Sequence, residues 1–481
     1  MYRYKLDSSF EKIPLEINIV KASLNDKGFA DLLSINLEYT CKLNRAKNRI
    51  NEYNSSVWEE VKKHTNPYEF IYAFNTKHKG NDYRSVSIIK PLSRSFFKMI
   101  EMIHEFCPHI LNEDSRESKE KDYQRNRKKN KQIIFDDDNN DNDDNVDNKE
   151  DNINNKIIDN VFNDNEIHLN GTSTLIPLLI SVHIAEGPGG FIEAVRFVRK
   201  GKYDDHAFGM TLIDNKYNNN FHTYKGARRI QPIVLKPLVP GWKQSNHFLL
   251  NNPEVHIING TDGTGDIYKP ENIIFLDNEM RKVGDIGGAH LITADGGFDF
   301  SIDYNYQEQS SCKLIFSQIL TAIKCQRTDG TFICKFFDIN LYLTVEMLYL
   351  LYSIYETVTI YKPFTSRIAN SEKYIICNNF RGIEPVLYNN LFNVLTQWNN
   401  YNSETINQLF KEIPISFIER INEINRDIVN LQINSINNAI NIIKKQKYIT
   451  NSYIYSSEIT VDKQIKYAKD WCKRYNIPYN H

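Results

Sequence analysis

The sequence predicts an α/β fold built on a mostly parallel, doubly wound sheet. From about residue 166 onwards, short apolar segments of strand length alternate with amphipathic segments of helix length. This alternation is typical of parallel strands joined by helical crossovers. A glycine-rich turn also follows the first of these apolar segments directly. A chain of 481 residues with 41% hydrophobic residues can hold one large domain with flanking segments.

The first predicted strand covers residues 178–186 and leads through the glycine-rich turn into a helix from about Phe191. Amphipathic helices are expected at 308–327 and 341–354, and another begins near residues 92–98 with Ser93 as its candidate N-cap. Further strands are expected at 207–211, 256–260, 289–295, 330–336, 355–361 and 373–378.

The flanks divide the chain into three predicted parts. Residues 1–90 contain no recognisable module, and residues 384–481 have helical periodicity. The last helix, near 461–475, is basic and is either an amphipathic cap or an RNA-facing helix. Between these flanks, the predicted catalytic domain at 91–383 is interrupted at about 113–165. The Asn, Asp and Lys of that stretch cannot bury enough apolar surface to offset ordering entropy, so it is expected to be a disordered insertion.

The net charge of −1 conceals a strong segregation. Residues 136–151 carry nine acidic residues against one lysine, a charge of −8, so the rest of the chain carries about +7. A mildly basic folded part is what an RNA-binding surface requires, although many other enzymes share it.

The seven cysteines are scattered and form no Cys-x-x-Cys pair, which predicts buried, reduced thiols rather than a zinc site or disulfides. We find neither a run of eighteen apolar residues nor a secretory signal, and therefore expect an intracellular protein with no membrane partner. The Asn- and Lys-rich bias suits an AT-rich genome. The expected location is the nucleus or cytoplasm, or a viral factory or virion if the source is a large DNA virus.

The turn after the first strand is a candidate ligand site. Its glycines permit close approach of the backbone, and the following helix offers its N-terminal N–H groups. The turn lacks the spacing of a phosphate-binding loop, and its acid and proline suit methionine or ribose contacts better than a pyrophosphate. Taken alone, it could be just a tight turn. The candidate cofactor-binding residues here are Glu186, Gly187, Pro188, Gly189, Gly190 and Phe191.

Polar residues follow other predicted strands. Asp262 and Asp266 could accept hydrogen bonds from an adenine amine or a ribose hydroxyl, or could equally form Asx turns. Asp295 follows the strand at 289–295. Lys335 ends an apolar strand, so it either reaches the surface or is functional. A polar loop then carries Arg367, Asn370, Ser371 and Glu372.

In this order, the motifs resemble those of the FtsJ-like methyltransferases. The resemblance implies a Rossmann-like, S-adenosylmethionine-dependent fold with a central, mostly parallel seven-stranded sheet, helices on both faces and helical flanking segments. It covers about residues 90–112 and 166–383. It is carried by Ser93–Lys98, Glu186–Phe191, Ala294–Gly297, Phe332–Lys335 and Ser366–Glu372.

The family uses a Lys-Asp-Lys-Glu tetrad to methylate RNA 2′-hydroxyls, and the matching positions here are Lys98, Asp295, Lys335 and Glu372. Lys335 would be the general base, because burial, Lys98 and the charge of the cofactor all favour its neutral amine. The two acids would orient the lysines. Arg367, Asn370 and Ser371 lie beside Glu372 and are expected to hold the RNA backbone, and the chemistry requires no metal.

Within the family, the likeness is greatest to the enzymes that methylate the first transcribed nucleotide of capped mRNA. This implies the capped 5′ end as partner, together with other capping or transcription proteins. Recognition of a methylated guanine would need aromatic stacking, but the sequence assigns no aromatic residue to that role. The alternatives are a ribosomal or transfer RNA 2′-O-methyltransferase and a catalytically silent RNA-binding subunit of a capping complex.

Overall fold

The computed structural model describes most of the chain outside its central insertion. The insertion predicted at about 113–165 lies outside the described residues, so its expected disorder stays a prediction. The described residues are 1–6, 9–24, 33–72, 76–78, 81–83, 85–111, 178–199, 205–213, 242, 245–283, 287–298, 304–446 and 461–480.

The chain forms two compact units, each assembled from three stretches. The first contains residues 1–55, 179–191 and 206–437, and the second contains the remainder. The predicted domain limits at residues 90 and 383 stay predictions.

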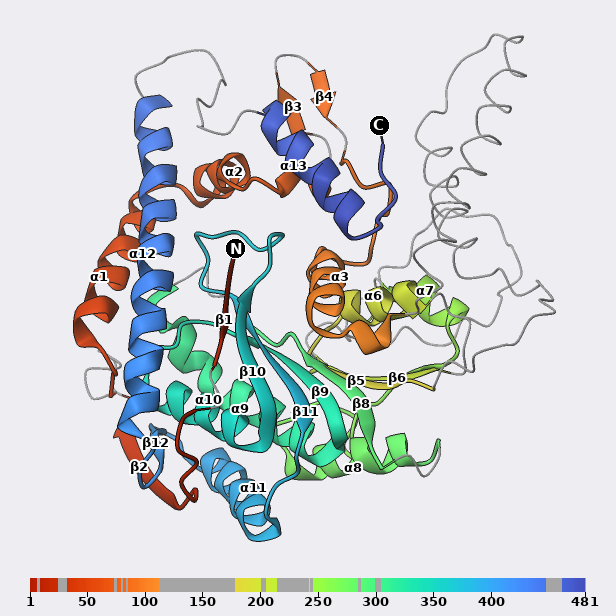
Figure 1. Cartoon of the computed structure of the whole chain (residues 1–481), viewed down its shortest axis with the longest axis vertical. Helices are drawn as coiled ribbons and strands as arrows, with labels where there is room; N and C mark the ends of the chain where they lie inside the picture. The colour runs from red at the N-terminus through yellow and green to blue at the C-terminus, as the bar shows by residue number, and fades with distance from the viewer. Residues whose placement is uncertain are drawn as a thin grey trace, which may run out of the picture. The chain divides into compact units, whose positions relative to one another are not determined.

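An eight-stranded sheet forms the centre of the first unit, in the order β1-β10-β11-β9-β8-β5-β6-β7 (Figure 1). Four of its seven neighbouring pairs are parallel, and the three at the β1 end are antiparallel. The predicted α/β class is therefore confirmed. The strands are β1 Tyr2–Lys5, β5 Ile180–Ile184, β6 His206–Met210, β7 Val255–Ile257, β8 Ala289–Ala294, β9 Gln326–Phe336, β10 Tyr355–Lys362 and β11 Lys373–Phe380.

The order of the strands places a topological switch between β5 and β8. From β5 the chain moves outward through β6 and β7, and it returns to the opposite side of β5 with β8 and β9. In such sheets ligands bind beyond the carboxyl ends of the strands at the switch. The first unit therefore has its natural ligand position just after β5 and β8.

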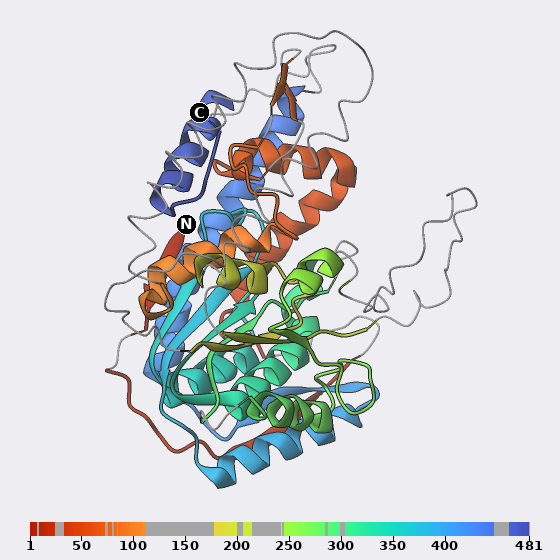
Figure 2. The same ribbon diagram turned by 90° about the vertical axis from the view of Figure 1, so that its right-hand side faces the viewer.

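Four helices cover one face of the sheet, as Figure 1 and the side view in Figure 2 show. Their apolar residues are mostly buried; in α10, for example, eleven of thirteen residues are. These contacts stabilise the sheet by removing apolar surface from water. The helices are α8 Pro270–Arg281, α9 Gln307–Cys325, α10 Tyr342–Ile354 and α11 Pro385–Asn399.

Two strands in the flanks correct the sequence-based expectation. β1 adds an eighth strand, where seven were expected, and pairs with β10 from Tyr2↔Lys362 to Lys5↔Thr359. The C-terminal region was expected to be helical, but β12 (Glu404–Phe410) pairs with β2 (Ile17–Ser23). Both pairings join segments more than 350 residues apart in the chain, so local periodicity could not reveal them.

The remaining elements of the first unit are short or flank the sheet. α1 (Leu37–Asn48) begins at Asn36, whose side chain accepts a hydrogen bond from the backbone N–H of Tyr39. α7 covers Asn246–Asn251, and α12 begins at Ile415 and runs to Gln446, with the part up to Asn437 in this unit. Asn437 of α12 accepts a hydrogen bond from Arg49, which ties the end of α1 to the long helix.

The second unit contains α2 (Ser55–Thr65), α3 (Ser95–Phe106), most of α6 (Gly190–Arg199), α13 (Val461–Arg474) and the hairpin β3 (Thr76–His78) and β4 (Asn81–Tyr83). α3 begins after Arg94 with no side-chain cap, so the expected N-cap at Ser93 is wrong. Instead, the Ser93 hydroxyl bonds to that of Ser95 at 2.5 Å.

α13 is amphipathic, as one of the two readings of the last helix requires. Trp471 and Cys472 are buried, and the Trp471 indole donates to Glu101 at 2.8 Å. Lys463, Lys466 and Lys473 are exposed. An RNA contact by these lysines stays a prediction.

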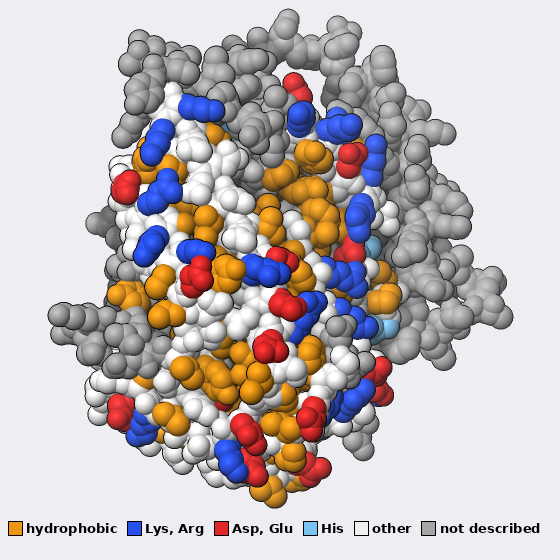
Figure 3. Space-filling view, turned by 60° about the vertical axis from the view of Figure 1, so that its left-hand side comes forward, with side chains coloured by type: hydrophobic (Ala, Val, Ile, Leu, Met, Phe, Trp, Pro, Cys, Tyr) orange, Lys and Arg blue, Asp and Glu red, His pale blue; other side chains and the backbone are white. Residues whose placement is uncertain are grey.

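One face of the molecule shows how its charged side chains are distributed. On the face drawn in Figure 3, Lys and Arg side chains are dispersed, with acidic ones among them. All seven cysteines are free, and six are buried, whereas Cys41 is exposed against expectation. Within the described part of the chain, no helix is both long and apolar enough to cross a membrane.

Candidate active site

A cavity of about 370 Å³ opens at the carboxyl ends of β5, β8 and β9 in the first unit. This is the switch position at which an open α/β sheet binds its ligand. Three residues of the predicted tetrad line it. The lining residues are Ala185, Gly187, Asp295, Gly297, Phe298, Gln307, Lys335, Phe337, Asn370 and Glu372.

Asp295 and Lys335 form the tightest pair at the cavity. Asp295 follows β8 and Lys335 lies at the end of β9, and the two strands run parallel as neighbours. The Lys335 Nζ lies 3.2 Å from Asp295 Oδ1 and donates to the Asp295 backbone oxygen at 2.6 Å. Only 11% of the lysine side chain and 16% of the aspartate side chain are exposed. A charge pair this sheltered from solvent holds its geometry better than a surface pair.

A glycine leaves room for the lysine. A Cβ at Gly297 would lie 3.2 Å from Lys335 Nζ, closer than a side chain normally approaches. The Phe337 ring has its centroid 5.8 Å from the same nitrogen, and its Cζ would lie 3.4 Å from a Cβ at Gly297. These two neighbours explain why the turn after β8 has a glycine at this position.

Tyr374 is a third member of this cluster that the sequence reading missed. Its hydroxyl donates to Asp295 Oδ1 at 2.8 Å, and its ring packs against Phe191 at 5.9 Å between centroids. Burial, followed by the charges of Asp295 and Glu372, raises the pKa of Tyr374 well above its usual value. The hydroxyl therefore keeps its proton and serves as a fixed donor to Asp295.

Glu372 reaches the cavity from a loop rather than from a strand end. The loop runs from β10 to β11, and Glu372 is its last residue. The Ser366 hydroxyl donates to Glu372 Oε1 at 2.9 Å. Asn370 of the same loop lines the cavity, whereas Ser371 is buried and donates to Gln307. Of the predicted RNA-binding residues, Asn370 therefore faces the cavity, and Arg367 is not among the lining residues.

Of the cofactor-binding residues predicted in the glycine-rich turn, only Gly187 lines the cavity. Gly187 and Ala185 line the cavity, and Gly189 adopts φ +107°, a conformation that favours glycine. Glu186 points inward, where Thr293 donates to its Oε1 and His183 Nδ1 lies 3.3 Å from its Oε2. Burial raises the pKa of Glu186, partly opposed by His183 and Thr293. Of the other predicted residues, Phe191 is fully buried, and Pro188, Gly189 and Gly190 are not among the lining residues.

The carboxylates of Asp262 and Asp266 are engaged within their own loop between β7 and α8. Asp262 Oδ1 accepts from the Thr264 backbone N–H at 3.0 Å and its hydroxyl at 2.7 Å, and its Oδ2 pairs with Lys269. Lys269 is the main reason that the pKa of Asp262 lies well below its usual value. Asp266 accepts from the Tyr268 backbone N–H at 2.9 Å. The geometry is that of the Asx-turn alternative; a cofactor role for either acid stays a prediction.

Lys98 lies in the other unit. It is buried in α3, with 5% of its surface exposed. Its place in the tetrad stays a prediction. The pair at the cavity of the first unit is Asp295 and Lys335.

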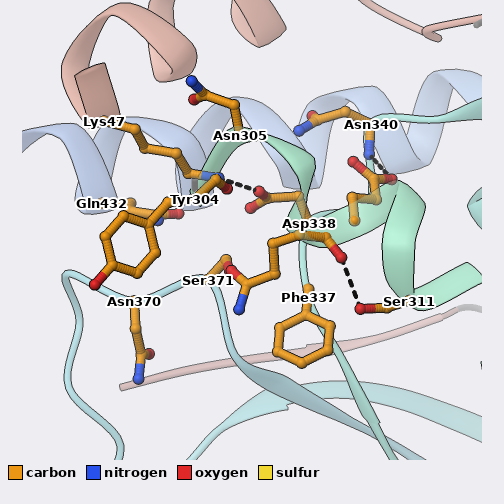
Figure 4. Close-up of polar contacts among 12 residues, drawn as sticks. Lys47, Tyr304, Asn305, Ser311, Phe337, Asp338, Asn340, Asn370, Ser371 and Gln432 are labelled. Carbon is orange, nitrogen blue, oxygen red and sulfur yellow. Dashed lines mark hydrogen bonds and ion pairs between the residues drawn. The ribbon is translucent and has the colours of Figure 1, made fainter. Parts of the chain in front are cut away.

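Behind the cavity lies a buried polar network (Figure 4). Lys47 pairs with Asp338 at 2.6 Å, and Glu308 Oε1 accepts the backbone N–H groups of Asn340 and Leu341 at 2.8 Å each. Burial raises the pKa of Glu308 to about 7. Burial also raises the pKa of Asp338, but Lys47 and two further lysines outweigh it, so that this pKa lies below its usual value. The network supports the strand end that carries Phe337.

A strand-period rule would have revealed one of the missed residues. Side chains two positions apart along a strand point to the same side. Phe337 follows Lys335 by two residues, and both line the cavity. The rule does not reach Tyr374, because Glu372 precedes β11 in a loop. Gln307 gave no comparable signal, because it reaches the cavity from the first residue of α9.

The sequence around the cavity matches a known family of domains. Residues 158–380 match the sequence model of the FtsJ-like methyltransferases. This range contains the glycine-rich turn, Asp295, Lys335 and Glu372, and so confirms the resemblance seen in the sequence. This stretch, which is less than half of the chain, is similar to the FtsJ-like methyltransferases.

Individual relatives narrow the likeness. "Cap-specific mRNA (nucleoside-2'-O-)-methyltransferase 1" of Xenopus laevis is 30% identical over 302 residues, which are 63% of this chain and 32% of that protein. The Homo sapiens protein of the same name is 36% identical over 213 residues, 44% of this chain and 22% of that protein. The chain thus spans about a third or less of the length of these relatives. A solved ribosomal RNA methyltransferase of Plasmodium falciparum matches at 18% identity and a TM-score of 0.28, over 43% of this chain and 88% of its own.

Proposed function

We propose that this chain transfers a methyl group from S-adenosylmethionine to the ribose 2′-hydroxyl of the first transcribed nucleotide of capped mRNA, converting cap 0 to cap 1. The observation that carries the proposal is the Asp295–Lys335 pair, which shares its cavity with Glu372 at the switch of the sheet. The cap-specific relatives support the choice of RNA.

The cavity suits the cofactor. Gly187 lines it without a side chain, and Ala185 has only a methyl group, so a ligand can approach the backbone after β5 closely. Glu186, buried beneath this turn, has its carboxylate beside His183 and Thr293 and does not line the cavity, so a ligand would meet the backbone of the turn. S-adenosylmethionine supplies an electrophilic methyl group already activated by its sulfonium. The protein therefore has to position the ribose and remove one proton.

Lys335 is the proposed proton acceptor. Its Nζ faces the cavity from a strand end, and it can take the 2′-hydroxyl proton when its amine is neutral. Asp295 orients the amine through Oδ1 and its backbone oxygen, and Tyr374 holds Asp295 in place. Asp295 and Glu372 then stabilise the resulting ammonium, and Lys98 completes the proposed tetrad.

The test is methyl transfer from labelled cofactor to short RNAs. Capped RNA with an N7-methylated guanine is compared with uncapped RNA and with structured ribosomal and transfer RNA fragments. We expect label on the 2′-oxygen of the first nucleotide of the capped RNA. Label only on ribosomal or transfer RNA would overturn the cap assignment, and RNA binding without transfer to any substrate would favour a silent subunit.

Lys335→Ala tests the base. We expect methyl transfer to fall at least about a thousandfold, because the proton acceptor is lost, while cofactor binding measured by calorimetry survives. Lys324→Ala is the control, because Lys324 lies at the end of α9 and pairs with Asp277 away from the cavity. Turnover like that of the unmodified protein in Lys335→Ala would contradict the assignment.

A further inference from the structure

Lys362 is a buried lysine directly beside the loop that carries Glu372. It is the last residue of β10, and 1% of its surface is exposed. Its Nζ donates to the Asn370 backbone oxygen at 2.8 Å, to Asn370 Oδ1 at 2.8 Å and to the Glu372 backbone oxygen at 2.5 Å. An ammonium group has three N–H donors, and these three acceptors can take all of them.

A second buried lysine holds the residue in between. Lys373 is also 1% exposed, and its Nζ donates to the Ser371 backbone oxygen at 2.9 Å and to that of Phe337. The carbonyl groups of three consecutive residues, 370 to 372, are therefore held by two ammonium groups. The loop from 363 to 372 contains no strand or helix. The lysines thus provide the hydrogen bonds that a strand ladder provides elsewhere.

The contact with Asn370 also fixes the direction of its amide. An ammonium group can only donate, so the amide must present Oδ1 to Lys362. Its Nδ2 donors are then left for the cavity that Asn370 lines. Donors in this position suit an anionic or hydroxyl oxygen of RNA.

We propose that Lys362 is a positioning residue of this active site. It holds the Glu372 backbone and orients the Asn370 amide, so that both side chains meet the RNA in one geometry. Burying an ammonium group is costly unless its donors are satisfied. Its three contacts with the catalytic loop account for a lysine at this position, which a methionine could otherwise fill. The inference rests on the proposed function.

The test compares Lys362→Met with Lys362→Arg in single-turnover methyl transfer. We expect Lys362→Met to lower the rate about 10- to 100-fold, because a misplaced group loses its catalytic orientation. The dissociation constant for S-adenosylmethionine should change less than about threefold, because Gly187 lies on the other side of the sheet switch. Lys362→Arg, which keeps the charge and N–H donors, should retain more activity than Lys362→Met. A normal rate in Lys362→Met would overturn the proposal.

A double-mutant cycle with Glu372→Gln separates positioning from general damage. If Lys362 acts through the loop, the rate loss of the double variant should be at least about tenfold smaller than the product of the two single losses. Losses that simply multiply would overturn the proposal. If Lys362→Met does not fold, Lys362→Gln takes its place in the cycle, because it keeps two donors.

Arg199→Met is the matched control, since Arg199 is also buried but pairs with Asp205 after α6, and neither residue lines the cavity. It should lower the melting temperature to a similar degree yet keep the rate per folded molecule within about threefold. Equal rate losses in both variants would overturn a positioning role.

Hydrogen exchange keeps this inference distinguishable from the proposed function. Lys362→Met should increase deuterium uptake in residues 363–372 and leave residues 326–336 unchanged. If the unmodified protein methylates no RNA but the uptake changes as expected, the proposed function fails and the support of the loop by Lys362 stands. Unchanged deuterium uptake in residues 363–372 overturns the support of the loop by Lys362.

Discussion

The two sides of the cavity hold their acidic groups by different means. Asp295 and Lys335 stand at the ends of two parallel strands, and the ladder between β8 and β9 fixes their separation. Glu372 stands on a loop whose carbonyl groups are held by buried lysines. Tyr374 connects the sides, because it lies in β11 directly after the loop and donates to Asp295.

This difference shows two routes to a rigid site. Strand ends are positioned by backbone hydrogen bonds that any sequence can form, so side chains there can be exchanged without moving the backbone. A loop depends on particular side chains, and each exchange risks moving the whole segment. Substitutions on the strand side should therefore change chemistry, whereas those on the loop side should change geometry as well.

Asp295→Asn should have the largest effect on the strand side. The amide can still accept from Lys335 and Tyr374, but the negative charge that orients and balances the lysine is lost. We expect single-turnover methyl transfer to fall about 100-fold or more with little change in the melting temperature. A large fall in the melting temperature would show that Asp295 also helps to hold the strand ends in place.

Tyr374→Phe should have an intermediate effect, on both the methyl-transfer rate and the stability. It removes the hydroxyl that donates to Asp295 but keeps the ring packed on Phe191. We expect a rate loss of about three- to tenfold and a loss of about 1.5–3 kcal/mol in the free energy of unfolding, as for a hydrogen bond to a charged group. Urea denaturation and single-turnover kinetics measure the two effects, and neither effect appearing would contradict the proposed link.

Glu308→Gln should have the smallest effect, on stability alone. The pKa of Glu308 rises from its usual 4.5 to about 7 on burial. Between these values the unfolded chain releases a proton that the folded protein retains, so the free energy of unfolding falls as the pH rises from about 4.5 to 7 and then levels off. Glutamine does not titrate, so the free energy of unfolding of the variant lacks this pH dependence. Its amide oxygen can still accept the N–H groups of Asn340 and Leu341.

The melting temperature of Glu308→Gln relative to the unmodified protein should therefore increase between pH 5 and pH 7.5. Asp338 and Lys373 also interact with Glu308, and neither is altered in the comparison. A difference that stays constant with pH would contradict the raised pKa.

The sequence predicted the strand side of the site far better than the loop side. Periodicity located β8 and β9, and the geometry of parallel strands then brings Asp295 and Lys335 together. It also located β11, but no local pattern indicated that Lys362 and Lys373 would turn inward to hold the loop. The inward turn of Glu186 was hidden for the same reason, because His183 and Thr293 come from two different strands.

The short strand β1 has a consequence for handling the protein. It covers the edge of β10, whose residues are mostly buried and whose backbone groups would otherwise be left open on one side. An uncovered apolar edge is a template for pairing with another chain. A recombinant version that begins after Leu6 would present this edge, and its self-association would arise from the loss of six residues far in sequence from the catalytic motifs.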